Sequence, residues 1–193
     1  MLEIIFHGRG GQGAVTSSEI MASAAARGGY EAQAFSFFGA ERRGAPVFSF
    51  LRIDNRKILK HGMFFKADIL VVLDKGLLGF PDIKKVTLKD GGSLILNVEP
   101  GQGKRYAENI KREGKTKIYS VNATKIVLKE GLVLAGWPIV NMAILGAVIK
   151  ALGFPSLSSL KEAILEKFEG EVAEKNVRSA TRAFDETVEE GVI

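Results

Sequence analysis

The chain has 193 residues, of which 46% are hydrophobic and 25% charged, with a net charge of +5 and no cysteine. These values are typical of a globular chain with a sizeable core, and they exclude intrinsic disorder, collagen and coiled coil as descriptions of the whole chain. Without cysteine, the chain alone cannot build a disulfide, an iron–sulfur cluster, a thiolate zinc site or a cysteine nucleophile.

Strands and helices are expected to alternate along the chain. Short apolar runs bounded by turn residues predict strands, and alanine-rich segments with glycine or proline at their ends predict helices. In chain order we expect strand 2–7, helix 16–27, strands 32–38 and 47–53, a hairpin turn at 54–56 that returns into 57–59, strands 69–73 and 93–97, helix 104–113, strand 117–121, and helices from 123, from 138, from about 156 and from 171 to the end.

This alternation is typical of an α/β fold. We therefore predict a single Rossmann-like domain over residues 1–193, with a mostly parallel sheet, an antiparallel hairpin and a helical C-terminus. A capping-box spacing, Ser159 followed by Glu162, marks the start of one of the last helices.

One stretch tests whether the chain crosses a membrane. Residues 132–149 contain no charged side chain, and this length is at the threshold for a membrane span. Pro138 is interpreted as the first turn of a helix, and a helix from Pro138 to Leu152 is too short to cross a bilayer. No targeting segment is visible, so we expect a cytoplasmic protein without a membrane partner.

The basic residues of 104–117 have few aromatic residues among them, so no nucleic-acid partner is expected.

The motif with the clearest chemical meaning is Gly8-Arg9-Gly10-Gly11-Gln12-Gly13. It has the G-x-G-x-x-G spacing between a predicted strand and a predicted helix, which is the setting of a dinucleotide fingerprint. Glycines allow the backbone to approach a phosphate, and the helix N-terminus offers free N–H groups and a positive dipole. A P-loop is excluded because Ala14 stands where its lysine belongs. The alternative is a tight strand–helix turn whose glycines only permit packing.

The second strand lacks the acidic residue that an NAD site places near its end. It is followed instead by Arg42 and Arg43, between Gly39 and Gly44. An arginine pair suits a phosphorylated ribose, as in NADP or coenzyme A, unless the two residues are only surface charges.

The two histidines, His7 and His61, lie in no recognisable catalytic arrangement, and no metal-ligand spacing is present.

Three blocks occur in order: the glycine motif, then Gly39-Ala40-Glu41-Arg42-Arg43-Gly44, then Asn141-Met142-Ala143-Ile144-Leu145-Gly146-Ala147. Together they resemble the gamma subunit of 2-oxoacid:ferredoxin oxidoreductases, most closely that of the pyruvate enzyme, pyruvate synthase. The resemblance extends over essentially the whole chain.

The resemblance implies a heterotetrameric complex of alpha, beta, gamma and delta subunits. Such complexes decarboxylate a 2-oxoacid, reduce ferredoxin and release an acyl-CoA. Thiamine diphosphate, magnesium and the iron–sulfur clusters are then expected on partner subunits, and the isolated chain is expected to be inactive. The resemblance also implies that this chain contacts coenzyme A, through Gly8, Gly10, Gly11, Gln12, Gly13, Arg42, Arg43 and Asn141. For Asn141, a buried helix cap is an equal alternative.

Two other hypotheses stay open at this point. One is a free-standing NADP-binding oxidoreductase, which needs a proton donor and a hydride site within this chain. The other is a non-catalytic scaffold subunit whose glycine loop serves packing alone. No residue of the chain is assigned as a general acid or base.

Overall fold

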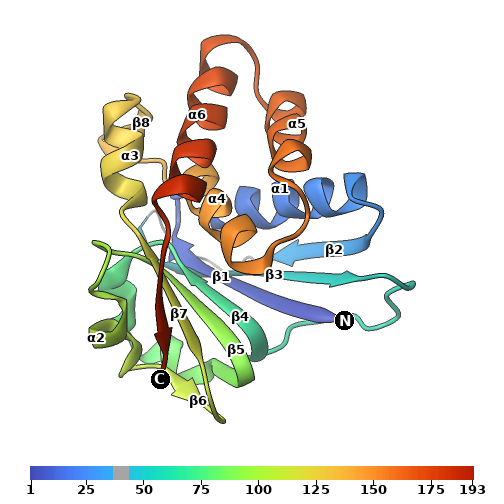
Figure 1. Ribbon diagram of the computed structural model, residues 1–193, viewed down its shortest axis with the longest axis vertical. Coiled ribbons are helices and arrows are strands. Elements are labelled where there is room, and N and C mark those ends of the chain that lie inside the picture. The colour runs from blue at the N-terminus through green and yellow to red at the C-terminus, as the bar shows by residue number, and fades with distance from the viewer. Residues whose placement is uncertain (37–43) are drawn as a thin grey trace.

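The computed structural model describes residues 1–36 and 44–193. Its main sheet has the strand order β10–β7–β5–β4–β1–β3–β2, with β6 paired to β5 (Figure 1). Strands β1, β4, β5 and β7 run parallel, while β3 and β2 at one edge and β10 at the other run antiparallel to their neighbours. The strands are β1 Leu2–Arg9, β2 Glu31–Ser36, β3 Pro46–Asp54, β4 Lys66–Val72, β5 Thr87–Asn97, β6 Lys111–Arg112, β7 Lys117–Val121 and β10 Val188–Val192, and β8 Val133–Leu134 and β9 Trp137–Pro138 form a separate small hairpin.

Most of the helices gather on one face of the sheet (Figure 1). The opposite face is covered by shorter elements: two 3₁₀ turns and the short helix α2. The helices are α1 Ala14–Arg27, α2 Gly103–Ala107, α3 Ala123–Lys129, α4 Asn141–Leu152, α5 Leu157–Lys167 and α6 Gly170–Glu186, and the 3₁₀ turns are η1 Lys75–Gly79 and η2 Pro81–Lys85.

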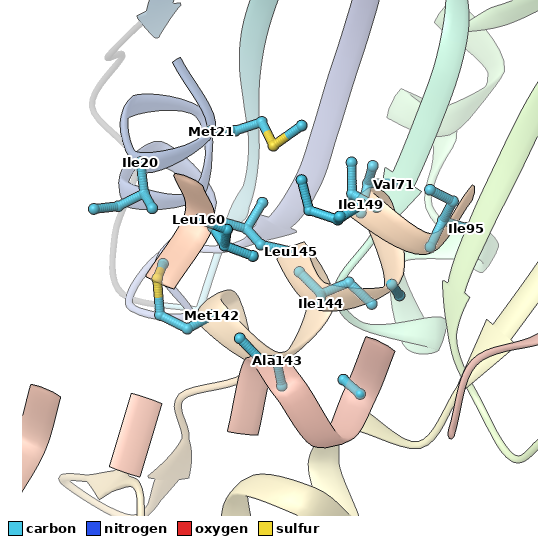
Figure 2. Close-up of a cluster of buried hydrophobic side chains, with 14 of the residues drawn as sticks. Ile20, Met21, Val71, Ile95, Met142, Ala143, Ile144, Leu145, Ile149 and Leu160 are labelled. Carbon is cyan, nitrogen blue, oxygen red and sulfur yellow. The ribbon is translucent and has the colours of Figure 1, made fainter. Parts of the chain in front are cut away.

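Helix α4 is the centre of the larger core. Every residue from Asn141 to Ile149 is buried, because the helix lies between the sheet and the other helices. Figure 2 shows α4 side chains meeting those of α1 and α5, close to Val71 and Ile95 of the sheet. The second half of the uncharged stretch, residues 141–149, is therefore part of a core helix, and its first half contains the β8–β9 hairpin. Among the described residues, no helix combines the length and apolar character that a membrane crossing requires.

The α/β class, the mostly parallel sheet, an antiparallel hairpin and the C-terminal helices are confirmed. The position of the hairpin was predicted wrongly, because residues 57–59 form no strand. The reason is that β3 already has β1 on one side and β2 on the other, so neither of its edges is free. Both antiparallel partners of β3, β1 and β2, come before it in the chain, and the segment after it pairs with neither edge.

Several predicted helix boundaries were also wrong. The helix expected over 104–113 stops at Ala107, and Lys111–Arg112 pair with β5 as β6. Pro138 belongs to β9, and α4 begins at Asn141. The N-cap of α5 is Ser156, whose hydroxyl accepts the N–H of Ser159, so the proposed Ser159 cap lies one turn too late. Helix α6 ends at Glu186, after which Val188–Val192 covers the open edge of β7.

Glu190 fixes this last strand to the loop before α2. Its carboxylate accepts the backbone N–H groups of Gly101 and Gly103 at 2.9 and 2.8 Å, that of Lys104 at 3.1 Å, and the hydroxyl of Ser120. Burial raises the pKa of Glu190, but these four hydrogen bonds lower it by more, so its pKa lies below the ordinary value. The ionised carboxylate therefore stabilises the folded chain.

We expect Glu190→Gln to lower the free energy of unfolding at neutral pH by about 1–2 kcal/mol, since an anionic acceptor is lost. The contribution of Glu190 is present above the pKa of an unfolded glutamate and is lost as the pH falls through its lowered folded value. Urea unfolding at pH 7 and pH 3 measures this difference, which should shrink in acid. Exposed Glu31→Gln is the control, and an equal effect of both variants would contradict the assignment.

Candidate functional site

The candidate site lies at the carboxyl ends of the parallel strands. The chain leaves β1 through α1 towards β2 on one side, while β4 lies on the other side of β1. This reversal makes the β1–β4 boundary a topological switch point, where open α/β sheets bind their ligands. The glycine loop follows β1, and Asp74 follows β4.

Two glycines of the loop adopt backbone conformations that other residues rarely adopt. Gly11 has φ +96° and Gly13 has φ +82°, and Gly13 is the N-cap of α1. Gln12 closes the turn, because its side-chain Oε1 accepts the N–H of Arg9 at 2.8 Å and its own N–H donates to the Arg9 carbonyl at 2.9 Å. The first turn of α1 has neither a side-chain cap nor an acidic residue, so its positive end has no anionic side chain of its own there.

The glycines of the motif serve different purposes. A Cβ on Gly8 would lie 3.2 Å from the Ala14 Cβ and 3.3 Å from the Leu73 Cδ2, so Gly8 allows α1 to pack against the end of β4. A Cβ on Gly13 would lie 2.4 Å from the Asn141 Nδ2. Gly13 therefore allows α4 to approach the loop.

Asn141 joins the third sequence block to the first. It is the first residue of α4, it is buried, and its side chain lies against Gly13. Its Oδ1 accepts the backbone N–H of Met142 at 2.9 Å. The structure thus places Asn141 beside the glycine loop and gives it a bond to the start of its own helix.

An ion pair connects the glycine loop to the end of β4. The Arg9 Nε donates to the Asp74 Oδ2 at 2.6 Å, and the Gln12 Nε2 reaches the same oxygen at 3.4 Å. The other Asp74 oxygen accepts the N–H of Gly76 at 2.7 Å. The predicted strand ended just before Asp74, but no sequence pattern indicated that Arg9, at a variable position of the fingerprint, would neutralise this carboxylate.

A cleft of about 360 Å³ opens beside this pair. Asn97 fixes one wall, since its Nδ2 donates to the Leu73 carbonyl at 2.8 Å and to the Thr124 hydroxyl at 2.9 Å. Trp137, the only tryptophan of the chain, is partly exposed at this cleft. The lining residues are Gln12, Leu73, Asp74, Lys75, Asn97, Val98, Glu99, Asn122, Thr124, Trp137 and Pro138. Apart from Gln12, none of these was predicted as a site residue, because their proximity depends on how distant segments of the chain pack together.

The His7 side chain packs away from the candidate site. Its ring is fully buried, stacks on Phe48 at 4.1 Å and has Nδ1 3.1 Å from the Val47 carbonyl. Burial lowers the pKa of His7 to about 4, so the ring is neutral at neutral pH. The geometry therefore gives His7 a structural contact with the backbone of Val47.

Arg42 and Arg43 lie outside the described residues. Gly44, the next residue in the sequence, donates its N–H to the Gly10 carbonyl at 3.0 Å, and the Gly10 N–H donates to the Ala45 carbonyl at 2.8 Å. The segment that follows the arginine pair is thus bonded to the glycine loop. Within residues 1–36 and 44–193, no group of three or more His, Cys, Asp or Glu side chains is arranged to hold a metal ion.

A glycine turn at the switch point of a mostly parallel sheet is the arrangement of open α/β proteins with a ligand crevice at that point. The family model described as pyruvate ferredoxin/flavodoxin oxidoreductase matches residues 3–186, and the chain belongs to this family. The family resemblance seen in the sequence is thereby confirmed.

Similar proteins agree with this assignment. A curated relative from Thermococcus kodakarensis, the pyruvate/ketoisovalerate oxidoreductases common subunit gamma, is 48% identical over 188 residues, covering 97% of this chain and 98% of the relative. The crystal structure of pyruvate oxidoreductase subunit PORC from Thermotoga maritima is 31% identical with a TM-score of 0.79, covering 98% of both chains. These matches make the chain a gamma-type subunit of an oxidoreductase complex.

A third similar structure is the 2-oxoglutarate:ferredoxin oxidoreductase from Magnetococcus marinus with 2-oxoglutarate, coenzyme A and succinyl-CoA bound. It has a TM-score of 0.69 and 21% identity, and the match covers 95% of this chain but 30% of that chain. At this identity the similarity concerns the fold alone. The gamma-type fold is therefore found as one part of a longer oxidoreductase chain.

Proposed function

We propose that this chain is the gamma subunit of a pyruvate:ferredoxin oxidoreductase and helps to bind coenzyme A. The complex would convert pyruvate and coenzyme A to acetyl-CoA and CO2 and reduce ferredoxin. The observation that carries the coenzyme A assignment is the uncapped N-terminus of α1, next to the glycine loop and a cleft at the switch point. The alpha, beta and delta subunits, as proposed partners, would complete the enzyme in the cytoplasm.

The charges of the site suggest that the phosphates of coenzyme A and its other polar groups bind at two different places. Asp74 and Glu99 line the cleft together with one basic residue, Lys75, so phosphate groups are less favoured there than at the positive end of α1, although Arg9 partly neutralises Asp74. The phosphates would instead lie at the glycine loop, near Gly10 to Gly13, with Arg42 and Arg43 as counter-charges. Carboxylate and amide groups in the cleft suit the hydroxyl and amide groups of coenzyme A, and Trp137 offers a ring for stacking.

Asn141 would act through the loop. Its side chain lies against Gly13, so it holds the turn in the conformation that presents N–H groups to an anion. The contribution of this chain to the reaction is then positioning of coenzyme A and neutralisation of its phosphates. Thiamine diphosphate with magnesium supplies the decarboxylation chemistry and the iron–sulfur clusters carry the electrons, both on the partner subunits.

Purification through a tag on this chain from its own cells tests the subunit assignment. We expect three further subunits, iron and thiamine diphosphate to come with the chain, and pyruvate-dependent ferredoxin reduction to require coenzyme A. A chain that purifies alone, without iron and with bound NADP, would contradict the proposal and support the free-standing oxidoreductase.

Arg42→Ala with Arg43→Ala tests the phosphate contacts in the purified complex. We expect the KM for coenzyme A to rise roughly tenfold or more, since charge-assisted hydrogen bonds are lost, while the KM for pyruvate stays within twofold. Arg105→Ala, an exposed arginine of α2, is the matched control. An unchanged KM for coenzyme A in the double variant would favour the scaffold hypothesis.

A further inference from the structure

The face of the sheet opposite the long helices carries a second, aromatic cavity. Its volume is about 350 Å³, and it lies in the part of the molecule where β3 is covered by the segment after it in the chain. Phe48 and Phe50 of β3 meet Phe65 edge-on at 5.9 and 5.8 Å between ring centroids. The lining residues are Ala45, Pro46, Phe48, Phe50, Met63, Phe65, Asp82 and Lys85.

The cavity differs from the candidate coenzyme A site in its chemistry. Six of its eight lining residues are apolar, and its two charged residues, Asp82 and Lys85, pair with each other at 2.5 Å. The side chain of Met63 is 48% exposed at its edge, and nearby in sequence Leu59 is 76% exposed. Large exposed apolar side chains next to an aromatic pocket are typical of protein interaction sites.

The segment that supplies Met63 and Phe65 to this cavity is basic. Residues 55–66 carry Arg56, Lys57, Lys60 and Lys66 and no acidic residue. Lys66 pairs with Glu113 at 2.8 Å, whereas Arg56, Lys57 and Lys60 are exposed and form no ion pair within the described part of the chain. Lys84 in η2 is also exposed and has no ion pair there. Both chain segments that line the pocket beside β3, residues 55–66 and η2, therefore carry basic side chains without an ion-pair partner in the described part of the chain.

We propose that this cavity, with Met63 and the basic segment 55–66, docks another subunit of the oxidoreductase complex. The occupant is a large apolar side chain on a segment rich in aspartate and glutamate. Buried aromatic pockets provide the affinity of such contacts, the flexible thioether of Met63 adapts to the inserted group, and the lysines select the acidic neighbours of that group. This inference rests on the proposed role as a subunit of the complex.

Photo-crosslinking in the assembled complex identifies the occupant. The photoreactive amino acid benzoylphenylalanine replaces Met63 in one preparation and Leu165, an exposed leucine of α5, in the control. We expect position 63 to crosslink to one other subunit, at a peptide with a large apolar residue flanked by acidic ones. A crosslink to a second copy of this chain, to its own residues 37–43 or to a basic peptide would overturn the proposal, as would the absence of any crosslink.

Charge and shape variants give a second measurement. We expect Met63→Asp, and Lys57→Glu with Lys60→Glu, to weaken incorporation of the chain into the complex at least tenfold, with Leu165→Asp as control. Raising the salt concentration should weaken wild-type assembly more than that of the double lysine variant. If the variants and the control assemble equally well, the docking surface is wrong although the subunit assignment stands. A chain that joins no iron-containing complex contradicts both.

Discussion

Arg52→Ala should lower the free energy of unfolding by about 3 kcal/mol, the lower end of the cost of breaking a buried ion pair. Arg52 is 3% exposed, and its Nε lies 3.0 Å from the Glu3 Oε1. Its guanidinium group also lies 4.6 Å from the centre of the Phe64 ring. The loss is expected at the lower end because Lys89 still binds the other Glu3 oxygen at 3.0 Å.

The pKa of Glu3 depends on the same ion pairs with Arg52 and Lys89. Burial raises the pKa of Glu3, but the hydrogen bonds from Lys89 and Arg52 lower it by more, and its pKa lies below the ordinary value. The stabilising effect is therefore present above the pKa of an unfolded glutamate and is lost as the pH falls through the lowered folded value. The difference between wild type and Arg52→Ala should shrink in acid.

Urea unfolding followed by circular dichroism measures this effect. Arg27→Ala is the matched control, because Arg27 pairs with Glu162 and Glu166 on the surface, where such pairs contribute about 0–1 kcal/mol. Arg52→Met combined with Glu3→Gln should recover part of the stability, since no uncompensated charge is then buried. Equal effects of Arg52→Ala and Arg27→Ala would show that the buried network does not stabilise the sheet.

Gly146→Ala should lower the free energy of unfolding by a similar amount, about 3 kcal/mol, through overpacking. A Cβ at this position would lie 2.0 Å from the Ala180 carbonyl oxygen and 3.0 Å from the Phe184 backbone nitrogen. Both contacts are with the backbone of α6, so no side-chain rotation relieves them. Helix α4 would have to move away from α6 and disturb the core drawn in Figure 2.

Thermal unfolding measures the effect, and a loss of 3 kcal/mol corresponds to a decrease in Tm of roughly 6–12 °C for a chain of this size. Gly79→Ala is the control, because a Cβ there meets no atom within 4 Å. A Tm for Gly146→Ala close to that of Gly79→Ala would mean that α4 and α6 are packed less closely than described.

The sequence predicted the elements with strong local patterns. The apolar runs before Asp74 and Asn97 identified the buried strands, and the glycine motif identified the turn at the end of β1. Pairing partners were not predictable in the same way, because the alternating pattern of Val47 to Ile53 fits any neighbouring strand. The strand Val188–Val192 was missed for a related reason, since it depends on the free edge of β7.

The candidate site likewise contains some features that the sequence predicted and others that only the fold revealed. The spacing of Gly8, Gly10 and Gly13 predicted the loop, but the contact between Gly13 and Asn141 joins residues far apart in the sequence and required the fold. The role of Gly146 in the third block was also hidden, because a glycine in a helix reveals a close backbone contact only when the neighbouring helix is known. Asp74 joins the site because β4 lies beside β1, and Trp137 joins it because the separate β8–β9 hairpin lies at the same cleft.

The most direct test of the proposed coenzyme A site uses Trp137, the only tryptophan of the chain. Because it lines the cleft beside the glycine loop, its fluorescence should change saturably when the purified chain is titrated with coenzyme A, and the change should be weaker with Gly13→Ala, whose new Cβ would meet Asn141. NADP at the same concentrations should have little effect. No response to coenzyme A, or a stronger response to NADP, would contradict the coenzyme A assignment.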